Sequence, residues 1–124
     1  TWSHVQLDKI SPSDASREIL KTNSLIYHIT GTYPTCLRPP YGAWKKDLEL
    51  PVTMLPVFWD VDTLDWQSQN PESILDIVRQ NVQDGSIILM HDSYDSSVRA
   101  ALAITDELTE KGYDFVTADQ LLDP

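Results

Sequence analysis

The sequence contains a single cysteine, Cys36, among its 124 residues. One cysteine excludes an internal disulfide framework and any zinc module built from several cysteines. Long apolar runs are missing as well, since no stretch approaches the ~20 residues that cross a bilayer. We therefore expect no membrane contact by this segment. The chain opens on Thr1 without the basic and apolar regions of a signal peptide, which favours a mature, processed or cut product.

Basic residues are scarce: Lys and Arg number 9 against 19 Asp and Glu, a formal net charge of −10. A negative field of this size repels phosphate backbones and anionic lipid headgroups, so it argues against nucleic-acid binding and peripheral membrane binding. The hydrophobic share of 41% and the charged share of 23% are typical of a globular protein. The length suits one domain with one core.

Helical and strand patterns alternate along the chain. Two helix starts have a capping residue followed by proline, Ser11 before Pro12 and Asn70 before Pro71. We predict helices from residue 12 to Gly31, from residue 71 to near Gly85, and over 96–111. We predict strands over 36–38, 53–61, 86–90 and 115–117. The apolar strand over 86–90 is expected to be buried on both faces. Alternating strands and helices imply parallel strands with right-handed crossovers, hence an α/β layered or barrel fold.

Charged side chains follow three successive predicted strands. Arg38 follows the first, Asp62 and Asp65 follow the second, and His91 follows the third. The loops at the carboxyl ends of parallel strands converge on one crevice. The sequence therefore predicts that these side chains form one functional site.

The segments that carry these residues are RPPY at 38–41, DTLDW at 62–66 and LMH at 89–91. In this order they resemble the third, fourth and fifth motifs of the NodB-homology polysaccharide deacetylases, a carbohydrate esterase family. Residues 1–4 (TWSH) look like the second motif, His-Ser/Thr-x-x-His, without its first histidine. The stretch WDVDTLDW at 59–66 is most similar to the peptidoglycan N-acetylglucosamine deacetylases.

The resemblance implies a distorted (β/α) barrel of the NodB-homology type, of which residues 1–124 would form the C-terminal part. A barrel of this kind needs about seven or eight strands, more than this chain supplies. We therefore expect the N-terminal half of the same domain to accompany it as a separate chain. The implied activity is metal-dependent hydrolysis that removes acetyl groups from N-acetylglucosamine of peptidoglycan, outside the cell and facing the cell wall. A membrane anchor upstream of this segment stays open.

The family holds its metal with one Asp and two His, a pattern that leaves an open position at a catalytic zinc site. Of these ligands, the resemblance assigns only His4 to this chain. The implied metal is Zn²⁺, with Co²⁺ as the alternative. The family's base, an Asp of the first motif, has no counterpart in these residues.

The remaining catalytic roles are also assigned by the resemblance. Arg38 would orient the missing Asp base through a charge-assisted hydrogen bond. The backbone N–H of Tyr41, the first donor after two prolines, would stabilise the oxyanion. His91 would be the general acid, and Asp65 would favour its charged form.

Three residues are assigned to the sugar. Trp66 and Tyr41 would form opposite walls of the substrate groove, and Leu89 would line an apolar pocket for the acetyl methyl group. For an aliphatic residue in a strand, ordinary core packing is the alternative.

The motifs carry the chemistry but leave the glycan open. A chitin-oligosaccharide or acetylxylan deacetylase of the same family is one alternative. A non-catalytic carbohydrate-binding relic of the fold is another. The third is an unrelated α/β module whose loops imitate the motifs.

Overall fold

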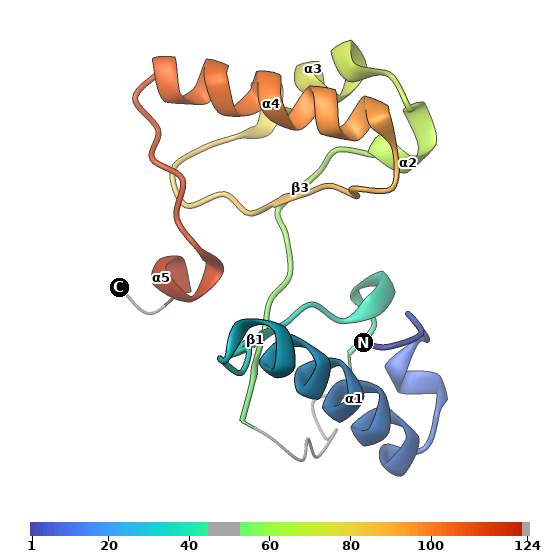
Figure 1. Ribbon diagram of the computed structural model, residues 1–124. Coiled ribbons are helices and arrows are strands. Elements are labelled where there is room, and N and C mark those ends of the chain that lie inside the picture. Colours follow the sequence, from blue (N-terminus) through green and yellow to red (C-terminus); the bar gives the residue numbers. More distant parts are fainter. Residues whose placement is uncertain (45–52, 123–124) are drawn as a thin grey trace. The chain divides into compact units, whose positions relative to one another are not determined.

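The computed structural model describes residues 1–44 and 53–122. The chain divides into two compact units, Thr1–Phe58 and Trp59–Pro124. Figure 1 shows the elements of each unit in chain order. Among the described residues, no helix combines the length and the apolar character that membrane crossing requires.

The first unit is built on the long helix α1, Pro12–Thr30 (Figure 1). Ser11 caps its start, because the hydroxyl accepts a hydrogen bond from the Asp14 N–H at 3.1 Å. Gly31 ends the helix at φ 75°, a left-handed conformation that favours glycine, and donates its N–H to the Tyr27 carbonyl at 2.8 Å. The predicted start and end signals of this helix are both confirmed.

Two short strands pair in the first unit. Strand β1, Cys36–Leu37, runs parallel to β2, Leu55–Pro56, with Cys36 opposite Leu55. The single-turn helices η1, Leu7–Lys9, and η2, Pro40–Gly42, complete this unit. Its buried core consists of Leu7, Ala15, Ile19 and Leu37, with Ile10, Trp44 and Met54 packed against it.

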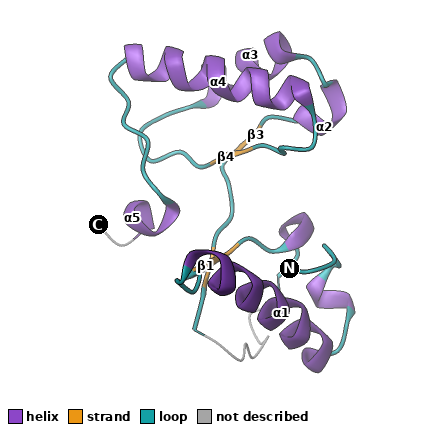
Figure 2. Ribbon diagram, in the orientation of Figure 1, coloured by secondary structure: helices purple, strands orange, loops and turns teal. Residues whose placement is uncertain are grey.

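The second unit is a β-α-β arrangement followed by further helices (Figure 2). Strand β3, Val61–Asp62, runs parallel to β4, Ile88–Leu89, with Asp62 opposite Leu89. The predicted parallel pairing is confirmed for both sheets. The helices of this unit are α2 (Asp65–Ser68), α3 (Pro71–Asn81), α4 (Asp95–Glu110) and α5 (Ala118–Leu122).

Helices α3 and α4 pack against each other and share the core of the second unit. The Asn70 side chain caps α3 by accepting the N–H groups of Glu72 and Ser73 at 3.0 and 3.2 Å. A hydrogen bond from Arg79 of α3 to Glu107 of α4 joins the two helices; together with a second bond from Lys111 at the end of α4, it lowers the pKa of Glu107 to about 2. The buried core consists of Val61, Ile74, Leu75, Val78, Ala100, Ile104 and Leu108.

The predicted single strand over 53–61 is wrong, because this stretch contains two strands of different sheets. Pro56 lacks an N–H and ends β2, and the next donor, the Val57 N–H, bonds the Leu37 carbonyl at 2.8 Å. The Asp60 N–H instead bonds the Ile87 carbonyl at 3.2 Å. The stretch therefore leaves one sheet and enters the other.

Three further features differ from the sequence prediction: a helix end, a strand and the burial of a strand. The helix that starts at residue 71 ends at Asn81, short of Gly85, because Val82 is already extended. The predicted strand over 115–117 is wrong: this segment is irregular, and its apolar side chains are exposed. In the apolar run over 86–90, only Leu89 is buried, since β3 is the one strand paired with β4 in the part of the chain that the structure describes.

Candidate active site

Asp65 and His91, predicted as a pair, are joined by two hydrogen bonds in the second unit. The Asp65 side chain begins α2 and is fully buried. Its Oδ1 lies 2.8 Å from Nδ1 of His91, and its Oδ2 accepts the His91 backbone N–H at 2.7 Å. One carboxylate thus fixes both the ring and the backbone of the histidine.

The charge state of Asp65 follows from its donors. Burial raises the pKa of this carboxyl, but hydrogen bonds from Ser97 and from the ring and backbone of His91 hold the pKa below its usual range. An ionised carboxylate only accepts hydrogen bonds, so Nδ1 of His91 must carry the proton that it shares with Asp65.

This arrangement leaves Nε2 of His91 as the nitrogen that can exchange a proton. No hydrogen bond to it comes from the described residues, and 38% of the His91 side chain is exposed. A buried carboxylate on one ring nitrogen and an accessible second nitrogen form the usual arrangement of a histidine acid or base.

A tight turn after β3 delivers Asp65 to this position. Leu64 takes a left-handed conformation at φ 51° and donates its N–H to Oδ1 of Asp62 at 3.0 Å. The hydroxyl of Thr63, itself fully buried, donates to the Leu89 carbonyl at 2.8 Å. Side-chain hydrogen bonds therefore tie the end of β3 to the end of β4.

A second clamp fixes the other end of the same strand pair. Oδ1 of Asp60 accepts the Ile87 N–H at 2.6 Å, and Oδ2 accepts the Ser86 hydroxyl at 2.7 Å. Burial raises the pKa of Asp60, but these bonds outweigh burial and keep the pKa below its usual range. The clamp sets the register that brings Asp65 to His91.

The predicted substrate residues of this unit lie beside the pair in sequence. Trp66 follows Asp65 on α2, and 50% of it is exposed, as a groove wall requires. Leu89 in β4 is buried and two residues before His91. Their roles toward a sugar and an acetyl group stay predictions.

In the first unit, the structure brings His4 and Tyr41 together. Their rings meet edge to face with centroids 4.9 Å apart. Both residues take left-handed backbone conformations, at φ 59° and φ 61°, which non-glycine residues adopt at a cost of roughly 1 kcal/mol. The predicted metal ligand and the predicted oxyanion donor are therefore neighbours.

The backbone N–H groups on either side of the Tyr41 turn differ in their partners. The N–H groups of Gly42 and Ala43 bond the carbonyls of Pro39 and Pro40, both at 3.1 Å. No acceptor for the Tyr41 N–H is found among residues 1–44 and 53–122. The two prolines stiffen the approach to this amide.

His4 is held by an anchor to α1. Glu18 accepts the N–H of Ser3 at 2.7 Å and its hydroxyl at 2.9 Å. The Ser3 N–H is the main cause that lowers the pKa of Glu18. The anchor leaves the His4 side chain exposed, and an exposed imidazole suits one metal ligand. Within the described ranges no group of three or more His, Cys, Asp or Glu could hold a metal ion.

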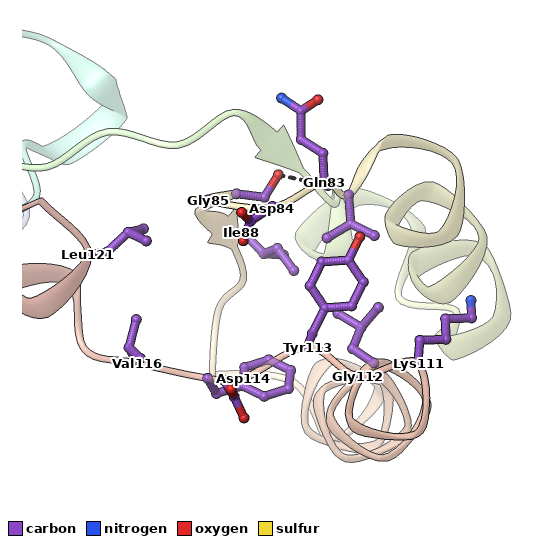
Figure 3. A pocket seen from close by; sticks show the side chains of 14 residues that line it. Gln83, Asp84, Gly85, Ile88, Lys111, Gly112, Tyr113, Asp114, Val116 and Leu121 are labelled. Atoms are coloured by element: carbon purple, nitrogen blue, oxygen red, sulfur yellow. Dashed lines mark hydrogen bonds between the residues drawn. The ribbon is translucent and has the colours of Figure 1, made fainter. Parts of the chain in front are cut away.

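Arg38 is exposed and forms no ion pair with any described residue. It lines a cavity of about 260 Å³ in the first unit, together with Thr1, Asn23 and Met54. A larger cavity, about 620 Å³, lies in the second unit and is lined by Ile88 at the start of β4, by the loop before β4 and by residues after α4. Figure 3 shows that Val116 and Leu121 point into it. None of the predicted site residues lines this larger cavity.

Residues 1–55 match the family model described as Polysaccharide deacetylase. Peptidoglycan-N-acetylmuramic acid deacetylase PdaC of Bacillus subtilis is 40% identical over 121 residues, which are 98% of this chain. The chain belongs to the polysaccharide deacetylase family. The predicted family membership is thus confirmed.

Two other polysaccharide deacetylase relatives bear on the function. Peptidoglycan-N-acetylglucosamine deacetylase PgdA of Listeria monocytogenes is 36% identical over 98% of this chain. The solved structure of BA3943 from Bacillus anthracis is described as a CE4 family pseudoenzyme. It is 27% identical to this chain, and the match covers 98% of this chain and 44% of the BA3943 chain, with a TM-score of 0.86.

The solved PdaC structure has a TM-score of 0.93 over 99% of this chain. This likeness confirms the predicted α/β fold of the polysaccharide deacetylases. The chain spans 61% of that solved chain, and 26% of the length of curated PdaC and of curated PgdA.

Sequence reasoning missed Ser97 and gave no role to Thr63. Thr63 lies inside the DTLDW segment, so its motif could have drawn attention to it. Ser97 lies outside every motif, in the first turn of α4. Its only signal in the sequence is that a helix begins shortly after His91.

Proposed function

We propose that this chain supplies part of the active site of a peptidoglycan deacetylase that hydrolyses the N-acetyl group of N-acetylglucosamine. The observation that carries the proposal is the Asp65–His91 pair, a buried carboxylate at 2.8 Å from one ring nitrogen with the other accessible. Membership of the polysaccharide deacetylase family supports it. As the C-terminal part of one catalytic domain, the chain would work with residues supplied by the rest of that domain, outside the cell at the wall.

The chemistry divides between a base and an acid. Water adds to the acetamide carbon, and the base, an Asp outside this chain that Arg38 orients, takes its proton. The rigid Tyr41 N–H donates to the oxyanion that forms. His91 then gives the proton on Nε2 to the nitrogen as the C–N bond breaks, which releases acetate and a free amine. Asp65 stabilises the imidazolium throughout.

His4 fits the role of one metal ligand, and the other ligands would come from outside this chain. A bound Zn²⁺ or Co²⁺ would polarise the acetamide carbonyl and lower the pKa of a bound water. Trp66 and the Tyr41 ring would hold the sugar between aromatic walls, and Leu89 would contact the acetyl methyl group.

The test is acetate release by the complete protein from purified peptidoglycan, from chitin oligosaccharides and from acetylxylan. We expect release from peptidoglycan, loss of activity with a chelator, and recovery with Zn²⁺ or Co²⁺. Mass spectrometry of the digested product decides between N-acetylglucosamine and N-acetylmuramic acid. Replacement of His91 by Asn should remove most of this release. Replacement of His28 by Asn is its matched control, since His28 is exposed on α1 and bonds only the Ser24 carbonyl among described residues.

A second function is favoured by one comparison, the likeness to the pseudoenzyme BA3943. A non-catalytic carbohydrate-binding relic would bind peptidoglycan with or without metal and release no acetate. Absence of acetate from every substrate, with metal present, would overturn the enzyme proposal in favour of this alternative.

A further inference from the structure

Ser97 is a buried serine of the second unit whose hydroxyl is used in an unusual way. It lies in the first turn of α4 and is 1% exposed. Its Oγ donates to Oδ2 of Asp65 at 2.6 Å, across 32 residues of sequence. Serines near a helix start ordinarily bond their own backbone, so this long-range bond serves Asp65 rather than the helix.

Three donors converge on the two oxygens of Asp65. Oδ2 receives both the Ser97 hydroxyl at 2.6 Å and the His91 backbone N–H at 2.7 Å. With Oδ2 held from two sides, the carboxylate plane cannot rotate, and Oδ1 stays directed at Nδ1 of His91. Two of the three donors belong to His91. The third is Ser97, which lies outside every motif of the sequence.

Loss of the Ser97 hydroxyl would leave the buried Oδ2 with one donor. An ionised group in a buried site relies on its hydrogen bonds, because water cannot replace a missing one. The carboxylate would then rotate toward other partners or bind a proton. Either change loosens the bond that orients the imidazole.

We propose that Ser97 is a positioning residue, which fixes the Asp65 carboxylate so that the His91 imidazole keeps the orientation and the proton placement needed for proton donation. The inference rests on the proposed function, since it concerns the same acid. Ser97 itself contacts no reacting atom in this scheme and acts through Asp65.

The experiment compares three substitutions of Ser97 in the complete protein. Ser97→Ala removes the hydroxyl, Ser97→Thr keeps it, and Ser97→Cys offers a weaker donor of nearly the same shape. We expect kcat for acetate release to fall on the order of ten-fold in Ser97→Ala, as for loss of a hydrogen bond to a charged group. KM should stay within about two-fold, because the groove walls are unchanged. Thr should restore most of kcat, and Cys should lie between.

The matched control is Ser96→Ala, on the same turn of α4, since the Ser96 hydroxyl bonds no group in the described part of the chain. Its kcat should equal that of the parent. Thermal unfolding of each variant identifies any that fails to fold. If Ser97→Thr does not fold, Ser97→Cys becomes the variant that keeps a donor, and its kcat should exceed that of Ser97→Ala.

A second readout does not depend on activity. In histidine-labelled protein, the Nδ1 proton of His91 should give a low-field, slowly exchanging resonance, assigned by its absence in His91→Gln. We expect this resonance to be lost or strongly shifted in Ser97→Ala and kept in Ser97→Thr. If the parent releases no acetate, the proposed function fails and the resonance alone decides the role of Ser97.

Two results would overturn the proposal. One is a folded Ser97→Ala protein with the parent's kcat and an unchanged His91 resonance. The other is an equal loss of kcat in Ala, Thr and Cys variants while the His91 resonance stays unchanged, which would mean that Ser97 only packs.

Discussion

Replacing Asp65 with Asn removes the negative charge beside His91 while keeping the shape of the side chain. The amide oxygen can still accept the Ser97 hydroxyl and the His91 backbone N–H, which now share Oδ2 at 2.6 and 2.7 Å. The amide NH₂ then faces Nδ1, which must accept rather than donate. An Nδ1 that accepts leaves the ring proton on Nε2, and an imidazolium that forms during the reaction no longer has a counter-charge beside it.

The magnitude follows from the geometry of the pair. Two unit charges about 4 Å apart attract by about 4 kcal/mol at the effective dielectric typical of proteins. The His91 side chain is 38% exposed, so solvent screens part of this attraction. A loss of about 3 kcal/mol, in line with a charge-assisted hydrogen bond, corresponds to a fall in kcat of roughly 100-fold. The melting temperature should also fall at neutral pH, because the lowered pKa of Asp65 means that its ionised form stabilises the fold.

The assay is steady-state acetate release by the complete protein at about one-unit steps between about pH 5 and pH 9. This range covers the pH values at which histidine side chains ordinarily change charge. In Asp65→Asn, kcat should stay below that of the parent across this whole range, since the amide no longer offers Nδ1 of His91 a carboxylate acceptor. Asp92→Asn is the matched control, because Asp92 is exposed and bonds no described residue. A kcat within about three-fold of the parent, or a parallel loss of bound metal, would refute the assignment of Asp65 as partner of the acid.

The other predictions concern the acid, a helix cap and pH. Replacing His91 with Asn should greatly reduce kcat while leaving the metal content intact, as measured by elemental mass spectrometry; loss of metal would make His91 a ligand instead. Asn70→Ala removes the acceptor for two N–H groups at the start of α3 and should lower the free energy of unfolding by about 1 kcal/mol in urea titrations, whereas an unchanged midpoint would contradict the cap. Asp60 and Asp65 have lowered pKa values in the folded protein, so their contribution to stability is complete above the usual aspartate value of about 4 and is lost as the pH falls below it. Unfolding free energies measured at pH 5, 4 and 3 (about one unit apart across this window) should therefore decrease in that order, and a rise would contradict the assigned ionisation.

The helices were predictable because their signals are local. Ser11 and Asn70 cap the helices that the sequence places after them, and both caps are present. The strand over 53–61 was not predictable in the same way, because a sheet partner is a non-local property. Pro56 and Asp60 lie in one apolar stretch, yet their neighbours bond different strands.

The site shows the same division between local and non-local information. Motifs gave Asp65 and His91, and the structure joins them directly. Ser97 could not be found, because a lone serine in a helical pattern has no period and no motif. Only the packing of α4 beside α2 reveals which hydroxyl meets the buried carboxylate.

Because of the Asp60 clamp, the Asp65–His91 pair forms only if the segments from Asp60 to Asp65 and from Ser86 to His91 keep their lengths. The clamp fixes Asp60 to Ser86 and Ile87 at one end of the parallel strands, while Asp65 meets His91 at the other. Each residue of strand advances the chain by about 3.3 Å, which exceeds the tolerance of any hydrogen bond between the pair. Inserting or deleting one residue on either strand would separate acid and partner even with every side chain retained. The number of residues from Asp60 to Asp65 and from Ser86 to His91 therefore matters as much as the identity of the residues at the ends of these segments.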